Sequence, residues 1–109
     1  MNTNVTTNNN ALCELALKGL YFVDDPEVGL NVVDLGLIYE LNFDEEAKKL
    51  DATMTLTSQF CPMGESITSN VLQSLSDAFQ EWYINLHLTY EPAWDSSMIS
   101  PEGKEFLGQ

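Results

Sequence analysis

The sequence predicts an α/β fold, an α+β two-layer sandwich in which the helices lie on one face of a mixed sheet. Apolar residues recur at helical spacing in two segments and alternate with polar residues in three, in the order helix, strand, strand, helix, strand. A short charged connection makes the first two strands antiparallel. The long helix then joins the second strand to the third, and a right-handed crossover of this kind leaves those two strands parallel.

The N-terminal part of the chain predicts a leader and one helix. The first ten residues are mostly Asn and Thr and predict a disordered leader, which leaves residues 11–109 as a single domain. Apolar residues at helical spacing predict a helix over Ala11–Leu20, with Asn10 as its N-cap. A loop follows at Asp25, because the next residue, Pro26, disfavours the helical backbone there.

Three strands are expected from alternation of apolar and polar residues. They cover Asn31–Phe43, Leu50–Thr57 and Tyr83–Glu91. In the first strand the residues expected on the core face are Leu35, Leu37, Tyr39, Leu41 and Phe43. The second strand places Leu50, Ala52, Met54 and Leu56 on one face and polar residues on the other, so one face of the sheet is packed and the other is polar.

The long helix is expected to begin at Pro62, with Cys61 at or next to its N-cap, and to run to about Trp82. Its apolar stripe consists of Ile67, Val71, Leu72, Leu75, Ala78 and Phe79. The tail contains Trp94, whose ring is expected to fold back over the sheet edge, and a last helical turn within Pro101–Leu107.

The charge balance excludes two classes of partner. The chain has 17 acidic residues and four lysines, which gives a net charge of −13. Nucleic acids and anionic membranes need clustered Lys or Arg to meet phosphate, so neither is expected as a partner. No apolar run approaches the ~20 residues that span a bilayer, and the first residues do not resemble a signal peptide. We therefore expect a cytoplasmic protein, in which a disulfide between Cys13 and Cys61 is not favoured.

Cys61 is the sharpest chemical feature of the sequence. It lies where a strand ends and a helix begins, so the positive end of the helix dipole and unpaired amide groups converge on it. That setting lowers the pKa of a thiol toward the thiolate, which binds metals and attacks electrophiles. Thr57 and Ser58 offer hydroxyl groups to the same locality. The alternative is a small buried packing residue, which is the interpretation favoured for Cys13.

Other ionisable residues give weaker signals. Asp25, Glu27 and Asp34 could ligate a cation or hydrogen-bond the loop that carries Cys61, although such Asp-Pro turns are common on surfaces. His87 is expected on the polar face of the last strand, where it could act as a base only if the fold brought it to Cys61. One thiol cannot complete a tetrahedral zinc site or a four-thiolate cluster site. Metal at Cys61 would therefore be transient, with further ligands from carboxylates, a small thiol or a second chain.

Four ordered segments resemble a known family. They are Asp25-Pro26-Glu27-Val28-Gly29-Leu30-Asn31-Val32-Val33-Asp34-Leu35-Gly36-Leu37-Ile38-Tyr39, Met54-Thr55-Leu56-Thr57, Cys61-Pro62-Met63 and Glu91-Pro92-Ala93-Trp94. Together they are similar to the signature of the small iron–sulfur cluster assembly proteins, which include the SUF-associated SufT proteins, PaaD and a eukaryotic cytosolic cluster-targeting adaptor. The resemblance runs from about Ala11 to Leu107.

The resemblance implies a two-layer fold, often in homodimers, and a role in maturing iron–sulfur proteins together with the assembly machinery and client apoproteins. It places the reactive cluster on Asp25, Glu27, Thr57 and Cys61, with Ser58 in the position of a second small polar residue. The expected cargo is a transient cluster or iron at Cys61, with no permanent cofactor. The alternatives are a metal-free adaptor that docks clients to the assembly machinery and a thiol enzyme that uses Cys61 with His87.

Overall fold

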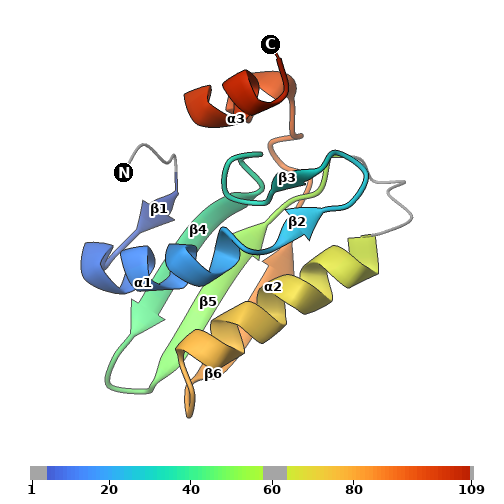
Figure 1. Cartoon of the computed structure of the whole chain (residues 1–109). Helices are drawn as coiled ribbons and strands as arrows, with labels where there is room; N and C mark the ends of the chain where they lie inside the picture. The colour runs from blue at the N-terminus through green and yellow to red at the C-terminus, as the bar shows by residue number, and fades with distance from the viewer. Residues whose placement is uncertain (1–4, 58–63, 109) are drawn as a thin grey trace.

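A computed structural model describes residues 5–57 and 64–108 of the chain. A four-stranded sheet in the order β1-β4-β5-β6 carries α1 and α2 on one face, and β2 and β3 form a separate hairpin (Figure 1). The elements are β1 Thr6–Thr7, α1 Asn10–Leu20, β2 Asp24–Asp25, β3 Leu30–Asn31, β4 Ile38–Asp44, β5 Lys49–Met54, α2 Gly64–Ala78, β6 Tyr83–Leu88, a 3-10 turn η1 Ser96–Met98 and α3 Pro101–Phe106.

The mixed sheet confirms the predicted strand directions. β4 pairs antiparallel with β5, and β5 pairs parallel with β6 from Lys49 opposite Tyr83 to Met54 opposite Leu88. The two helices cover the face on which Leu50, Ala52 and Met54 are buried, as the alternation in β5 predicts. The sheet and the two helices on one of its faces make up the predicted two-layer α/β architecture.

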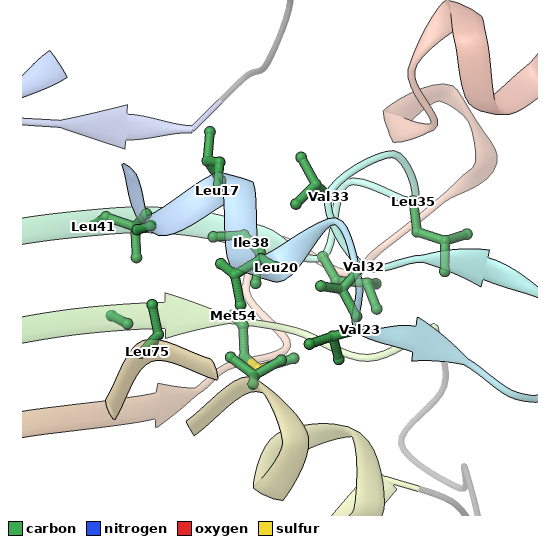
Figure 2. Close-up of a cluster of buried hydrophobic side chains, with 14 of the residues drawn as sticks. Leu17, Leu20, Val23, Val32, Val33, Leu35, Ile38, Leu41, Met54 and Leu75 are labelled. Carbon is green, nitrogen blue, oxygen red and sulfur yellow. The ribbon is translucent and has the colours of Figure 1, made fainter. Parts of the chain in front are cut away.

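The core lies between this sheet and the two helices. Figure 2 shows side chains of α1, α2, β4, β5 and the turns before β4 gathered in one cluster. Its labelled members are Leu17, Leu20, Val23, Val32, Val33, Leu35, Ile38, Leu41, Met54 and Leu75. Most of these side chains are fully removed from water, and burial of each contributes roughly 1.5–3 kcal/mol.

The expected continuous strand over Asn31–Phe43 is wrong. β3 ends at Asn31, the chain turns through residues 32–37, and β4 begins at Ile38. The register shifts between Ile38 and Glu40, so the alternation is offset by one residue. As a result Ile38 is buried on the core face, whereas Tyr39 is only partly buried and its hydroxyl donates to the Pro92 carbonyl oxygen at 2.8 Å.

Part of the segment expected as a disordered leader is ordered in the structure. Thr6 and Thr7 form β1, which pairs parallel with β4. The Asn8 side chain extends this pairing, because its amide donates to the Phe43 carbonyl and its oxygen accepts from the Phe43 amide, both at 2.8 Å. The N-cap of α1 is Asn9 rather than Asn10, with the Asn9 side chain accepting from the Leu12 amide at 3.0 Å.

The end of α2 also differs from the prediction. The helix ends at Ala78, and the next residues turn through Glu81, which has a φ of 73°. Phe79 and Trp82 nevertheless pack together with Phe43, at ring-centroid distances between 5.4 and 6.1 Å. The expected helix to Trp82 is therefore replaced by a shorter helix and an aromatic cluster that closes the core.

The C-terminal segment is tied to the turns before β4. The Trp94 indole donates to the Leu35 carbonyl oxygen at 2.6 Å, which ties the ring to the turn before β4. The Ser100 hydroxyl donates to the Asp34 carboxylate at 2.7 Å and accepts from the Gly103 amide, so Ser100 is also the N-cap of α3. No helix in the described parts of the chain is both long and apolar enough to cross a membrane.

Gly36 is the position where this arrangement depends on the absence of a side chain. Its φ is 79°, and a Cβ atom there would overlap the backbone of Met98. Gly36→Ala is expected to lower the free energy of unfolding by about 3 kcal/mol, because the left-handed backbone costs roughly 1–2 kcal/mol and the forced contact roughly 1–3 kcal/mol. Urea denaturation measures the change.

Gly29 provides the matched control for this prediction. Its φ is 83°, but a Cβ atom would meet nothing within 4 Å. Gly29→Ala should therefore cost only the backbone part, roughly 1–2 kcal/mol. Equal losses for the two variants would show that the contact with Met98 contributes nothing.

Candidate functional site

Three elements meet at one end of the molecule. The β2–β3 hairpin, the end of β5 and the first turn of α2 all lie at the right-hand end in Figure 1. Gly64 brings α2 close to the chain that follows β5, because a Cβ atom there would lie 2.8 Å from the Leu56 side chain. This end of the molecule contains Asp25, Glu27 and Thr57, three of the five predicted site residues.

Asp25 is fully buried at the end of β2. Its backbone carbonyl accepts hydrogen bonds from the amides of Val28 and Gly29, at 3.2 and 2.7 Å, and these close the hairpin turn. Its carboxylate oxygen Oδ1 accepts from the Glu27 amide at 2.9 Å. Pro26 stands between them and fixes the turn. The Asp-Pro-Glu sequence thus folds a carboxylate inward, although such turns are common on protein surfaces.

The second carboxylate oxygen of Asp25 is the unusual feature of this turn. Oδ2 is buried and has no hydrogen-bond partner within residues 5–57 and 64–108. A buried polar atom left unpaired costs roughly 1–3 kcal/mol, and more when it is charged. Such an atom in a native fold requires an explanation, of which a ligand or a catalytic role is one.

Thr57 and Glu27 lie nearer the surface. Thr57 is partly buried just after β5, and Glu27 is exposed in the hairpin turn, where its backbone amide holds Asp25. Ser58 and Cys61, the other two predicted site residues, lie outside the described residues. Their expected proximity to Asp25 therefore stays a prediction.

Thr55 is a candidate that the sequence analysis did not single out. It follows β5 and is fully buried, and its amide donates to the Leu37 carbonyl at 2.8 Å. Burial raises the pKa of the Tyr39 hydroxyl, and a hydrogen bond with Thr55 partly offsets that effect. Strand alternation placed Thr55 on the polar face, so no signal in the pattern indicated its burial.

Asp34 belongs to a different network. Its carboxylate accepts from the Asn31 side chain and from the Ser100 hydroxyl, both at 2.7 Å, and its carbonyl accepts from the Ser100 amide at 2.7 Å. These bonds tie the N-terminus of α3 to the turn after β3. Asp34 thus connects the C-terminal segment to the turn after β3, and its carboxylate already accepts these two side-chain hydrogen bonds.

His87 and Cys13 also lie outside this site. His87 is on the face of the sheet that the helices leave open, 3.7 Å from the Asp51 carboxylate, and about half exposed. Cys13 is buried in α1, where burial raises the pKa of its thiol. Among the residues that the structure describes, no three His, Cys, Asp or Glu side chains are grouped so that they could hold a metal ion.

Comparison with known proteins identifies the class to which this two-layer α/β fold belongs. Residues 16–80 match the family model described as iron–sulfur cluster assembly protein. The chain is 36% identical to the Fe-S protein maturation auxiliary factor YitW of Bacillus subtilis, over 90% of this chain and 95% of that protein.

Two further proteins are similar to this chain over most of their length. The chain is 37% identical to the Fe-S protein maturation auxiliary factor SufT of Staphylococcus aureus, over 79% of this chain and 97% of that protein. A crystal structure of a domain of unknown function, DUF59, from Bacillus anthracis superposes with a TM-score of 0.79 and 35% identity, over 91% of this chain and 98% of that one. The chain therefore belongs to the iron–sulfur cluster assembly protein family, as its motifs predicted.

Substitution of Asp25 tests the oxygen that lacks a partner in the part of the chain that the structure describes. Asp25→Asn keeps an oxygen for the Glu27 amide and removes the buried negative charge, so it is expected to raise the free energy of unfolding by about 1 kcal/mol. Urea denaturation of the two proteins measures this difference. A loss of stability of similar size would instead show that the carboxylate has a partner in the folded protein.

Proposed function

We propose that this chain is an accessory factor that assists the assembly of iron–sulfur clusters or their transfer to client apoproteins, acting through Cys61. Its partners would be the assembly machinery and the clients, and the cluster would be its cargo rather than a resident cofactor. Membership of the cluster assembly family supports the general role. The buried Oδ2 of Asp25, which is unpaired within residues 5–57 and 64–108, supports a site at this end of the molecule.

The position of Cys61 in the sequence supports its assignment as the reactive group. Cys61 falls between Thr57 and Gly64, and Gly64 begins α2. Two effects at a helix N-terminus, the helix dipole and the unpaired amides, stabilise a thiolate. A thiolate is the form that binds iron or exchanges with the thiols of a client.

Asp25 and Glu27 have separate roles in this proposal. Asp25 Oδ2, which has no hydrogen-bond partner among the described residues, would accept a hydrogen bond from the Cys61 segment or supply an oxygen ligand to iron. Glu27 holds Asp25 through its backbone amide and carries its own carboxylate on the surface. Thr57 and Ser58 would hydrogen-bond the Cys61 sulfur. One thiolate and one carboxylate leave iron with open positions, which suits a cargo that must be released.

Complementation separates this mechanism from passive docking. In a strain that lacks the gene, Cys61→Ala is expected to abolish rescue of iron–sulfur enzyme activity while the variant remains folded. Cys13→Ala removes the other thiol of the chain and is expected to rescue, provided that its circular dichroism and unfolding curve match the wild type. Full rescue by Cys61→Ala would remove Cys61 from the mechanism.

Anaerobic reconstitution with iron and sulfide addresses the adaptor alternative. An accessory factor that carries a cluster should show charge-transfer absorption and bound iron, alone or with an assembly partner, and Cys61→Ala should lose both. If the wild-type protein takes up no iron under either condition but still rescues the strain, the protein acts as a metal-free adaptor.

Thiol reactivity gives an independent test of the ionised state of Cys61. Burial raises the pKa of Cys13, so at neutral pH its thiolate fraction is lower than that of a free thiol, and alkylation should be slow until the pH becomes alkaline or urea is added. One fast-reacting thiol is therefore expected in native protein treated with iodoacetamide at pH 7. Mass spectrometry should locate the label at Cys61, and fast labelling at Cys13 would contradict this assignment.

A further inference from the structure

A groove lies between α1 and α2, which cover the same face of the sheet (Figure 1). The two helices come close at Gly19, where a Cβ atom would lie 2.6 Å from the Ser74 hydroxyl oxygen. The groove has a volume of about 560 Å³, and one of its sides is formed by the end of α1 and the start of β2. The other side is one face of α2, made of residues spaced by three and four along the helix: Asn70, Gln73, Ser74, Asp77 and Ala78.

Phe22 lines this groove with an aromatic ring that is 88% exposed. The backbone that carries the ring is held on both sides, because the Phe22 amide donates to the Gly19 carbonyl at 3.1 Å and the next residue, Val23, is buried in the core. An ordered turn thus presents the ring to solvent. Its apolar surface contributes little to folding, since it stays in water. The face of such a ring attracts a cation.

Two carboxylates, those of Asp24 and Asp77, line the same groove. The Gln73 amide donates to Asp77 Oδ1 at 2.9 Å, which fixes this carboxylate on its face of α2. Neither carboxylate forms an ion pair within residues 5–57 and 64–108, and no lysine of that part of the chain lines the groove. The groove therefore combines an aromatic face with two negative charges that lack a counter-ion from the described chain.

We propose that this groove is a docking site for an arginine-bearing segment of a partner protein. A guanidinium group stacks on an aromatic ring and donates paired hydrogen bonds to a carboxylate. Phe22 supplies the ring, and Asp24 and Asp77 supply the carboxylates. The ammonium group of lysine has no planar fork, so it fits the same three groups less well.

The composition of the chain rules out a second copy as the source of this segment. The chain contains no Arg, and its net charge of −13 repels another copy. The same charge attracts a basic partner and speeds its approach. Asp24 is exposed in β2, whereas its neighbour Asp25 is buried in the candidate site, so a docked segment would lie beside that site. A role in delivery to the site rests on the proposed function, whereas the binding itself does not.

Fluorescence anisotropy with labelled peptides tests the aromatic part of the groove. The full chain is titrated into fluorescein-labelled hexa-arginine amide and, separately, into hexa-lysine amide of equal charge. Hexa-arginine is expected to bind at least about twofold more tightly, and Phe22→Ala should weaken its binding about two- to fivefold. The matched control is Phe106→Ala, which removes a ring that is 68% exposed on α3 and should leave both affinities unchanged. Equal affinities for the two peptides, or equal losses in the two variants, overturn the proposal.

Removal of charge separates the two carboxylates from the general attraction of an acidic protein. A double variant with Asp24→Asn and Asp77→Asn loses two charges in the groove, and one with Glu45→Gln and Glu46→Gln loses two in the exposed turn between β4 and β5. The groove variant should weaken hexa-arginine binding at least about threefold more than the turn variant, because it also loses direct ion pairs. Equal weakening contradicts the docking site. Neither measurement involves iron or Cys61, so the groove and the proposed function can fail separately.

Discussion

The parallel pairing of β5 with β6 is the constraint on which the rest of the structure depends. Two parallel neighbours cannot be joined by a tight turn, so the chain must return along the sheet, and α2 performs that return. As a result, the end of β5 and the start of α2 lie at the same end of the molecule, next to the β2–β3 hairpin (Figure 1). The same crossover makes β6 the last strand and leaves its outer side without a partner among the described strands.

In the hairpin that carries Asp25, the two carboxylate oxygens differ in what they contribute to the turn. The Asp-Pro-Glu turn is closed by bonds to the Asp25 carbonyl and to one carboxylate oxygen, and these suffice to hold the backbone. The other oxygen contributes nothing to the turn within the described residues. A neutral residue would fold into the same turn at lower cost, so the charge at this position favours a chemical role over a structural one.

The sequence predicted those features that depend on local pattern. Alternation in Leu50, Ala52 and Met54 identified β5 and its buried face, and the lengths of the connections predicted both strand directions. The ordered motifs predicted the family. In the site, Asp25 was singled out as a candidate from the sequence, but its burial was not predicted, because Asp-Pro turns are common on protein surfaces.

The features that sequence reasoning missed depend on contacts between distant segments. The turns before β4 are held by Trp94 and Ser100, about sixty residues later in the chain. The pairing of β1 with β4 is extended by the Asn8 side chain, which bonds to Phe43. Neither interaction leaves a periodic signal. The roles of Cys61 and Ser58 stay predictions, since both lie outside the described residues.

The ion pair between His87 and Asp51 has a consequence for how the protein responds to its solvent. It is the one ion pair in which both side chains belong to residues 5–57 and 64–108, and its histidine is charged only when protonated. With 17 acidic residues and four lysines, the molecule therefore relies on dissolved cations to balance its surface. Its folded state should gain from ionic strength, because screening weakens self-repulsion over distances of about 10 Å at 0.1 M salt.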